Sequence, residues 1–332
     1  MATSPAKYTF PKIFKRLVNQ KDNKIRHFIE LRESRAYRQQ KGNVLVQGLK
    51  TINELKNEGF SFESLAVTAT KDPYTESDIK YPALQAIQNP DAFRANNLYL
   101  VDVDLTRRIL GTASRPGRHE LFAEVKIPDQ PLPSKENIDR LLVFDHVNDP
   151  GNLGTLVRTA KGLGWSAGVT TTGTCDMYND KTIRSSRALS LRWPFKLVDI
   201  KELVSFLRSY DMTPVVADMM PEVGSEASGD LWSPVEGGIS SKQSRTTKAN
   251  PTGNVGLGSG LWFWNFRGKT QEVPKRVALI LSSEHKGVQG LDDELRVSIP
   301  MAGGVESLNV ASAGSMLMYE FNRLLAVTDK RQ

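Results

Sequence analysis

Short apolar runs alternate with amphipathic segments from Lys24 to the C-terminal part of the chain, and this alternation limits the fold more than any other feature. RLLVFDHV (140–147) and VALILSS (277–283) are apolar almost throughout, as are strands covered on both faces of a parallel sheet. LGTLVRTAKGLG (153–164) and the long segment 307–327 instead place apolar residues at helical spacing. Strands that alternate with helices predict an α/β fold.

The 332-residue chain divides into four predicted parts. A basic N-terminal tail covers residues 1–23, and a small α/β domain covers residues 24–128. A proline-rich linker, 129–138, leads into a second α/β domain, 139–328. Within that domain, residues 220–274 are rich in Gly, Ser and Thr and show no clear period, so we expect a flexible inserted loop.

The charge balance favours an anionic partner, because 44 basic and 37 acidic residues give a formal net charge of +7. The single cysteine, Cys175, excludes an intramolecular disulfide framework, and four scattered histidines show no ligand spacing, so we expect no metal. No apolar run approaches the ~20 residues that span a bilayer, so we expect no membrane partner. The first acidic residue is Asp22, and this basic start is typical of either a disordered tail or an organellar leader. The compartment is therefore open between cytoplasm and organelle.

A turn rich in Gly and Asn follows the apolar run 140–147. It carries Asn152 and Gly154 and leads into a helix on which Arg158 lies six residues after Asn152. Backbone N–H groups at a helix N-terminus bind anions, and a nearby arginine binds phosphate bidentately. The turn therefore indicates a phosphate site, and a tight turn with a solvated arginine is the alternative. It is not the GxGxxG fingerprint of nicotinamide enzymes.

Two further loops follow apolar strands nearer the C-terminus. LILSSEHKGV (279–288) places Glu284 beyond a predicted strand end, where ligands bind in open α/β sheets, although Ser-Ser-Glu is equally suited to capping a helix. In VSIPMAGGVESLNVASAGSMLMYE (297–320), a loop that contains glycine precedes a long helix. We expect Ser307 to cap this helix and Asn309 to lie in its first turn, where asparagine is unusual.

At these three loops the sequence resembles the SpoU/TrmH family of RNA ribose 2′-O-methyltransferases, within the SPOUT group. The first family motif matches Asn152, Gly154 and Arg158. The second motif matches Glu284 and Gly287, but Ser282 stands where the family usually has glycine. The third motif matches at six positions, which are Ile299, Pro300, Met301, Ser307, Leu308 and Asn309.

The resemblance implies both a fold and an activity. The first domain is similar to the family's ribosomal-protein-like RNA-binding domain, most clearly over residues 24–55 and 112–117. The second domain would be a SPOUT domain with a parallel sheet and a trefoil knot. Family members transfer a methyl group from S-adenosylmethionine (SAM) to a ribose 2′-hydroxyl and are typically homodimers. We therefore expect a homodimeric RNA methyltransferase that acts on ribosomal RNA, with transfer RNA as the alternative substrate.

The resemblance also assigns roles to residues. By resemblance, Arg158 would be the base that takes the proton of the 2′-hydroxyl. Because a pKa above ~12 makes a neutral guanidine costly, we instead expect Arg158 to grip the phosphate beside the target ribose. The other catalytic residues would orient the hydroxyl or anchor a loop. The predicted catalytic residues are Arg158, Asn152, Glu284, Ser307 and Asn309. The predicted SAM-binding residues are Ser282, Gly287, Ile299, Met301 and Leu308. The predicted RNA-binding residues, each of which is otherwise a solvated surface charge, are Lys24, Arg26, Arg32, Arg35, Arg38 and Arg184.

Other functions are weighed against this one. A non-catalytic SPOUT-fold RNA-binding or ribosome-assembly factor is the main alternative, because the side chain of Ser282 would crowd a SAM pocket. A SPOUT enzyme that methylates a base is a second alternative, and an oxidoreductase is disfavoured because the dinucleotide fingerprint is missing. Tryptophans in the insertion would suit stacking on bases, but a mobile loop is the favoured interpretation; they are Trp232, Trp262 and Trp264.

Overall fold

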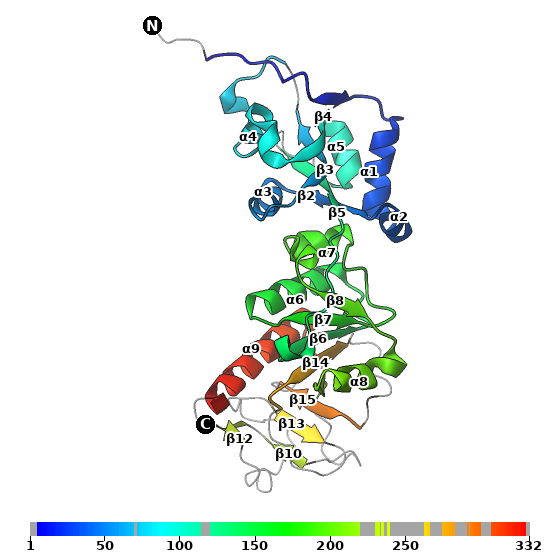
Figure 1. The fold of residues 1–332 in the computed structure, drawn as a ribbon, viewed down its shortest axis with the longest axis vertical. Coiled ribbons are helices and arrows are strands. Elements are labelled where there is room, and N and C mark those ends of the chain that lie inside the picture. The colour runs from blue at the N-terminus through cyan, green and yellow to red at the C-terminus, as the bar shows by residue number, and fades with distance from the viewer. Residues whose placement is uncertain are drawn as a thin grey trace. The chain divides into compact units, whose positions relative to one another are not determined.

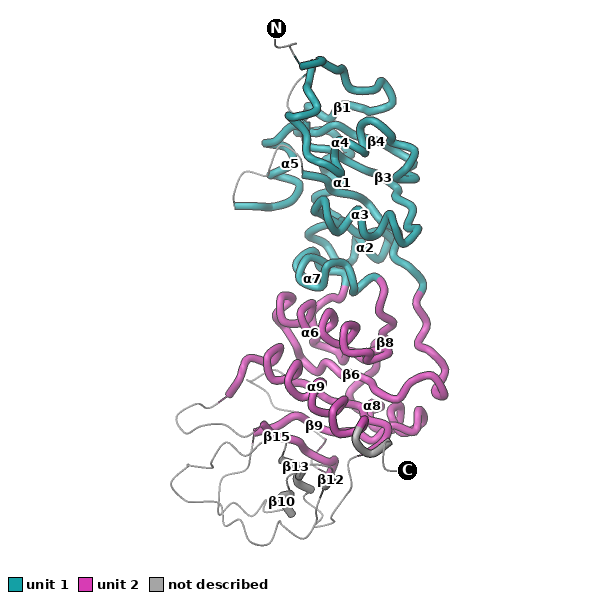
Figure 2. The backbone as a smooth tube through the Cα atoms, turned by 90° about the vertical axis from the view of Figure 1, so that its left-hand side faces the viewer, with its two compact units in different colours: residues 1–129, 178–191 teal, residues 130–177, 192–332 magenta. Residues whose placement is uncertain are grey.

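The computed structural model divides the chain into two compact units (Figure 2). Unit 1 comprises residues 1–129 and 178–191, and unit 2 comprises residues 130–177 and 192–332. Nothing in the sequence pattern marks 178–191 as part of unit 1, because this segment lies between two strands of the unit 2 sheet. The structure describes residues 5–69, 72–113, 120–219, 230–232, 234–235, 238–239, 262–265, 274–282, 291, 293–299 and 307–329.

Unit 1 is built on a mixed sheet with the strand order β1-β4-β3-β5-β2 (Figure 1). The strands are β1 (Lys15–Leu17), β2 (Asn43–Gln47), β3 (Phe62–Thr68), β4 (Ala95–Val101) and β5 (Leu121–Lys126). β1, β4 and β3 run parallel, whereas β5 is antiparallel to both β3 and β2. Along β3, Leu65 and Val67 lie in one core and Ala66 in another, so the sheet is buried on both faces.

Helices cover both faces of the unit 1 sheet. On one face, α1 (Asn23–Glu33) and α5 (Val103–Leu110) pack through Phe28 and Leu105. On the other face, α3 (Leu49–Asn57), α4 (Ala83–Gln88) and α7 (Asp180–Ser185) pack around Leu55, Ile87 and Ile183. Single 3-10 turns also occur in the described chain, at Glu76–Asp78, Pro90–Phe93, Lys135–Asn137 and Leu189–Leu191.

The amphipathic segment 24–40 forms two helices rather than one, α1 and α2 (Arg35–Lys41), with Ser34 between them. The backbone N–H of Ser34 ends α1 by donating to the carbonyl of Glu30, and its hydroxyl caps α2 by accepting from the N–H of Tyr37. Serine is among the preferred N-cap residues, so one side chain accounts for the break.

The predicted N-terminal tail is part of the fold over its described residues, which corrects the prediction of a free tail. Residues 15–17 form β1, which pairs with β4 at the edge of the sheet. Phe14 and Leu17 are buried in the two cores of unit 1. The strand escaped the sequence pattern because it has three residues, KRL, of which only the last is apolar.

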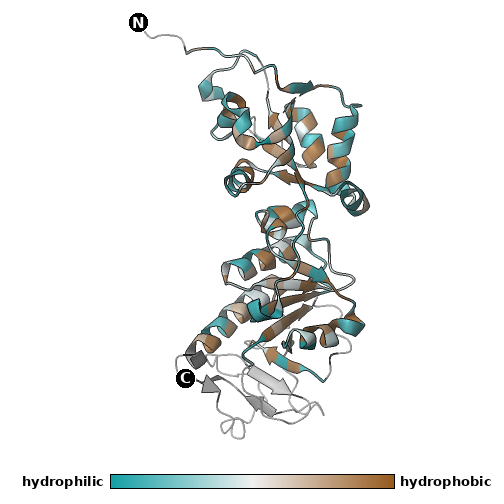
Figure 3. Ribbon diagram, in the orientation of Figure 1, coloured by the Kyte–Doolittle hydropathy of each residue, from teal (hydrophilic) through white to brown (hydrophobic). Residues whose placement is uncertain are grey.

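Unit 2 contains a sheet with the strand order β10-β13-β15-β9-β14-β6-β7-β8 (Figure 1). The six strands from β15 to β8 all run parallel, and the central ones are apolar, as Figure 3 shows. These strands are β6 (Arg140–Asp145), β7 (Ala167–Thr170), β8 (Phe195–Leu197), β9 (Thr213–Ala217), β14 (Val277–Ser282) and β15 (Leu295–Ser298). The predicted α/β fold with a parallel sheet is confirmed.

The described parts of the predicted flexible insertion contain short strands, and its flexibility stays a prediction. β13 (Trp262–Asn265) pairs antiparallel with β15, and β10 (Asp230–Trp232) pairs antiparallel with β13. β11 (Pro234–Val235) and β12 (Gly238–Ile239) form a separate two-stranded ribbon. No period was visible in the sequence because these strands have only two to four residues each.

Among the described residues, three helices pack on the unit 2 sheet. α8 (Ile200–Ser209) joins one core through Leu203 and Leu207. α6 (Pro150–Gly162) and α9 (Val310–Asp329) lie together, and a Cβ atom on Gly314 would approach the Leu156 side chain to 2.6 Å. Glycine, which has no Cβ atom, therefore permits the close approach of α9 to α6. Within the described residues, no helix has the length and apolarity that crossing a bilayer requires.

The middle of β7 leaves no room for a side chain. Gly168→Ala is expected to lower the free energy of unfolding by about 1–3 kcal/mol, because the added methyl would collide with the buried ring of Trp193. That ring cannot move freely, since its Nε1–H donates to the carbonyl of Trp165 at 2.8 Å. Urea denaturation followed by tryptophan fluorescence would measure the change. Gly162→Ala has open space around it and is expected to be neutral or to stabilise by up to ~1 kcal/mol; equal losses would contradict the packing argument.

Candidate functional site

The turn between β6 and α6 is fixed by local hydrogen bonds. Asp149 is the N-cap of α6, and its carboxylate accepts from the backbone N–H of Asn152 at 2.7 Å. Pro150 occupies the first helical position, where its missing N–H costs nothing. Asn152 therefore stands in the first turn of α6 with its side-chain amide free to face a neighbouring element.

That neighbour is the start of α9. Asn309 Nδ2 donates to Asn152 Oδ1 at 3.1 Å, so the first and third predicted motifs meet. Asn309 Oδ1 also accepts from the N–H groups of Ala311 at 2.9 Å and Ser312 at 3.3 Å. Asn309 is thus the N-cap of α9, and the predicted cap at Ser307 is wrong. Ser307 lies exposed, two residues before the cap.

Two substitutions at Asn309 separate capping from the inter-motif contact. Asn309→Ala is expected to lower the free energy of unfolding by about 1–2 kcal/mol, because two N–H groups lose their acceptor. Asn309→Ser keeps a capping oxygen and loses only the bond to Asn152, so a loss below ~0.5 kcal/mol is expected. Chemical denaturation of both variants measures the difference, and equal losses would show that Asn309 does not act as the cap.

α6 and α9 run side by side from this contact. Ser315 Oγ lies 3.4 Å from Thr159 Oγ1, and Asn322 Nδ2 donates to the carbonyl of Leu163 at 2.7 Å, so the helices are parallel. Arg158 lies on α6, next to Thr159 at the contact between the two helices, and is exposed. Its guanidinium makes no hydrogen bond or ion pair with any residue that the structure describes. Arg158 is therefore available to an anionic ligand.

The predicted cofactor residues within the described chain lie at one edge of the unit 2 sheet. Ser282 ends β14 beside Asp145, the last residue of β6, and Ile299 follows β15, which runs parallel to both. Leu308 precedes the cap of α9 and is half-buried, as is Ile299. Carboxyl ends of parallel strands are where ligands bind in open α/β sheets. Glu284, Gly287 and Met301 lie outside the described residues.

Asp145 is a buried carboxylate at this edge, and it is absent from the site residues predicted from the sequence. It accepts from the hydroxyl of Thr171 at 2.5 Å, and the same oxygen lies 2.9 Å from His146 Nδ1. The bond from Thr171 fastens the end of β6 to the loop after β7. The available signal was an acidic residue at the end of an apolar strand, RLLVFD.

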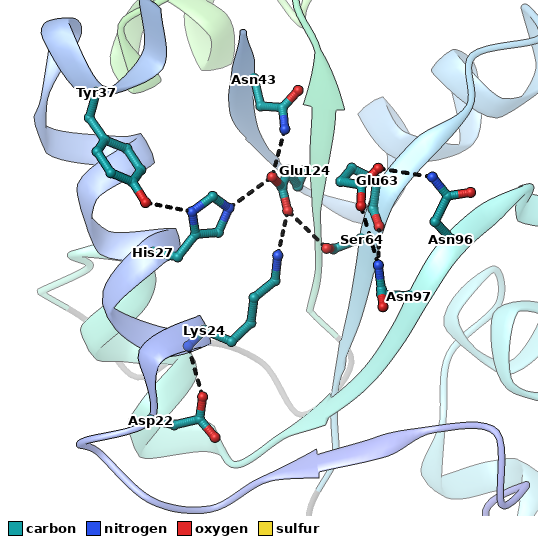
Figure 4. Close-up of polar contacts among 10 residues, drawn as sticks. All are labelled: Asp22, Lys24, His27, Tyr37, Asn43, Glu63, Ser64, Asn96, Asn97 and Glu124. Carbon is teal, nitrogen blue, oxygen red and sulfur yellow. Dashed lines mark hydrogen bonds and ion pairs between the residues drawn. The ribbon is translucent and has the colours of Figure 1, made fainter. Parts of the chain in front are cut away.

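Three of the predicted RNA-binding residues are engaged inside unit 1. Lys24 Nζ donates to Glu124 Oε2 at 2.7 Å (Figure 4). Arg32 donates to the last carbonyls of α5, and the buried Arg38 donates to those at the end of α1. A cation bonded within the fold is less available to a phosphate, and contact of these three residues with RNA stays a prediction. The remaining members are exposed and stay predictions; they are Arg26, Arg35 and Arg184, the last paired with Asp180.

Glu124 is the centre of a buried polar network that links α1 to three strands (Figure 4). Its carboxylate accepts from Asn43 Nδ2 at 2.7 Å and Ser64 Oγ at 2.8 Å, besides Lys24, and lies 2.8 Å from His27 Nε2. Burial raises the pKa of Glu124, but the bonds and charges of His27 and Lys24 outweigh it and hold the pKa at about 2, below the usual 4.5. Glu124 is therefore ionised at neutral pH. No group of His, Cys, Asp or Glu within the described chain is arranged to hold a metal ion.

Residues 139–228 match the family model of the SpoU rRNA Methylase family. Over 331 residues the chain is 24% identical to rRNA methyltransferase 3, mitochondrial, of Xenopus laevis, which covers 94% of this chain and 76% of that protein. Over 311 residues it is 25% identical to the 23S rRNA (guanosine(2553)-2′-O)-methyltransferase RlmP of Bacillus subtilis (strain 168), which covers 92% and 98% respectively.

Solved structures share the fold. The SpoU methyltransferase AviRb from Streptomyces viridochromogenes, in complex with the cofactor AdoMet, aligns with a TM-score of 0.64 and 20% identity over 91% of this chain and 98% of that chain. An AdoMet-bound rRNA methyltransferase from Sinorhizobium meliloti aligns with a TM-score of 0.63 and 17% identity over 94% and 98%.

Proposed function

We propose that this chain, whose residues 139–228 match the SpoU rRNA Methylase family model, transfers a methyl group from SAM to a ribose 2′-hydroxyl in ribosomal RNA. The observation that carries the proposal is the hydrogen bond between Asn152 and Asn309, because it joins two separated family motifs at the ligand-binding edge of the sheet. The relatives named above act on rRNA by name, which favours rRNA over tRNA. One is named mitochondrial and another is bacterial, which fits either compartment expected from the sequence.

The described residues at this edge fit SAM. Ile299 and Leu308 offer half-buried apolar side chains for the adenosine, and Ser282, also half-buried, offers a polar group at the same edge of the sheet. SAM supplies an electrophilic methyl group when bound. A serine at the end of β14 is therefore compatible with the site, and the non-catalytic alternative loses its one sequence argument.

The chain's own residues would position the RNA. Asn152 and Asn309 hold each other by their side-chain amides, and their remaining polar atoms would orient the 2′-hydroxyl for in-line attack. Arg158 would bind the adjacent phosphate bidentately, since its guanidinium is exposed and unpaired among the described residues. Holding the hydroxyl oxygen within ~3–3.5 Å of the methyl carbon is what such positioning contributes to the rate.

A homodimer belongs to the same proposal. Met316 and Tyr319 are 51% and 62% exposed on α9, beside the α6 helix that carries Arg158. Such exposed apolar side chains suit an interface between two copies of the chain. Arg158 would then reach the SAM site of the partner subunit. Sedimentation equilibrium tests the dimer. We expect wild type to be dimeric and the double variant Met316→Glu/Tyr319→Glu to be monomeric.

The activity is tested with purified protein, SAM labelled in the methyl group and rRNA transcripts. We expect label in dinucleotides that resist alkaline hydrolysis, because a 2′-O-methyl group blocks cleavage of the adjacent phosphodiester. Label in mononucleotides after alkaline hydrolysis would show a base methyltransferase. SAM binding without transfer on any rRNA would favour tRNA, and RNA binding without SAM binding would favour a non-catalytic factor.

A further inference from the structure

We propose that the N-terminal arm, residues 5–21, is an RNA-binding surface of unit 1 that contacts the phosphate backbone of the substrate. This inference rests on the proposed function, because it takes RNA as the partner. It concerns a part of the chain that lies outside the three methyltransferase motifs. The occupant is identified by charge complementarity between the arm and a polyanion.

Most of the chain's net charge lies in this arm. The arm contains four lysines and one arginine and no acidic residue, which gives +5. The whole chain has a net charge of +7, so all other residues together contribute only +2, the difference between these two values. A polyanion that approaches the protein is therefore attracted to this segment.

The arm is anchored to unit 1 rather than free. Tyr8 and Tyr74 exchange two backbone hydrogen bonds of 2.7 and 2.8 Å, and Phe10 stacks on Tyr74 with 4.6 Å between ring centroids. Further along, Phe14 and Leu17 are buried and β1 pairs with β4. Because these residues are already ordered in the folded protein, the arm loses less conformational entropy when it binds RNA.

The lysines of the arm face solvent. Arg16 is neutralised by an ion pair with Asp72, which also accepts from the backbone N–H of Phe10. The four lysines are all exposed, and none has a side-chain hydrogen bond or ion pair with another residue of the described chain; they are Lys7, Lys12, Lys15 and Lys21. Tyr8 follows Lys7 in the chain, and its ring, which is 40% exposed, suits stacking on an unpaired base.

The arm adds unpaired cations to the predicted RNA-binding set. Lys24, Arg32 and Arg38 are bonded within the fold and are therefore less available to RNA. The lysines of the arm are the unpaired alternative within the same unit.

The test compares the full-length protein with two triple variants. Lys7→Gln/Lys12→Gln/Lys15→Gln removes three charges from the arm and leaves Phe14, Leu17 and β1 intact. Lys50→Gln/Lys196→Gln/Lys201→Gln removes three exposed charges elsewhere. Affinity for an rRNA fragment is measured by fluorescence anisotropy from 50 to 300 mM KCl, and binding to anionic phosphatidylserine vesicles is measured in parallel.

We expect the arm variant to lose at least about 10-fold in RNA affinity near physiological salt and its log-log salt slope to shrink by about 2–3, with the control variant unchanged. Equal slopes for the arm variant and wild type would overturn the proposal, and so would tighter binding of wild type to vesicles than to RNA. SAM binding and methyl transfer are measured on the same samples. If wild type binds RNA through the arm yet transfers no methyl group, the proposed function fails and the arm stands; if transfer occurs and the arm variant binds normally, only the arm proposal fails.

Discussion

Glu124→Gln is expected to lower the free energy of unfolding of unit 1 by about 3 kcal/mol at pH 7. The substitution leaves the Lys24 ammonium inside the fold without its counter-charge, and breaking one partner of a buried pair costs about 3–5 kcal/mol. The depressed pKa gives a similar size, because holding a carboxyl at about 2 instead of 4.5 corresponds to about 3 kcal/mol. Hydrogen exchange of the β3 and β5 amides in the full-length protein would measure the loss without requiring two-state unfolding of both units.

The same variant predicts a pH dependence with a definite sign. The folded-state pKa of Glu124 lies below the unfolded value, so its stabilisation is complete above pH about 4.5 and is lost as the pH falls towards 2. The difference between wild type and Glu124→Gln is therefore expected to be full at pH 7 and much reduced at pH 3. Glu63→Gln, on the neighbouring strand, is the control, because its partners Asn96 and Asn97 are neutral amides and the loss should stay below ~1 kcal/mol (Figure 4). A penalty for Glu124→Gln that stays constant with pH would refute the assignment.

Much of the fold was predictable because buried parallel strands leave a strong mark on the sequence. β6 and β14 were expected from continuous apolar runs, and α9 from its helical spacing. β1 and the strands of the insertion were not predictable, because two to four residues are too few to show a period. Their partners are distant in the chain: β1 pairs with β4 some eighty residues later. Pairing at that separation is a property of the tertiary fold and leaves no local signal.

The motifs predicted which loops form the site, whereas the role of a single residue was harder to predict from its type. Asn152 and Asn309 were singled out from their loops, and the structure brings them into contact. The misplaced cap at Ser307 shows why exact positions fail: serine and asparagine both cap helices, and only the geometry selects between residues two positions apart. Basic residues were the least predictable, since Arg38 and Arg35 lie three positions apart on α2, yet one is buried and the other exposed. Burial depends on the neighbouring helix, which a sequence pattern does not contain.

Arg158→Ala is expected to reduce kcat for methyl transfer by at least about 100-fold while leaving the Kd for SAM within about two-fold of wild type. The guanidinium is exposed and has no partner among the described residues, so removing it should not disturb the fold. Arg158→Lys keeps the charge but not the planar fork that grips a phosphate at two points, so an intermediate loss is expected. Lys161→Ala, one turn further along α6, is the control, since its ammonium only donates to the carbonyl of Arg192. Single-turnover kinetics and isothermal titration with SAM separate the two effects.

Co-expression of Arg158→Ala with Asn309→Ala chains extends this experiment to the proposed dimer. If Arg158 serves the site of the partner subunit, a mixed dimer contains one site with both residues intact, and random pairing should restore about a quarter of wild-type activity. If Arg158 serves the site of its own chain, every site in the mixed population lacks one of the two residues and activity should stay at the level of the separate variants. Because each chain carries a different defect, the recovered activity reports the geometry of the site rather than the stability of either variant. Wild-type rates for Arg158→Ala alone would contradict the phosphate-gripping role at once.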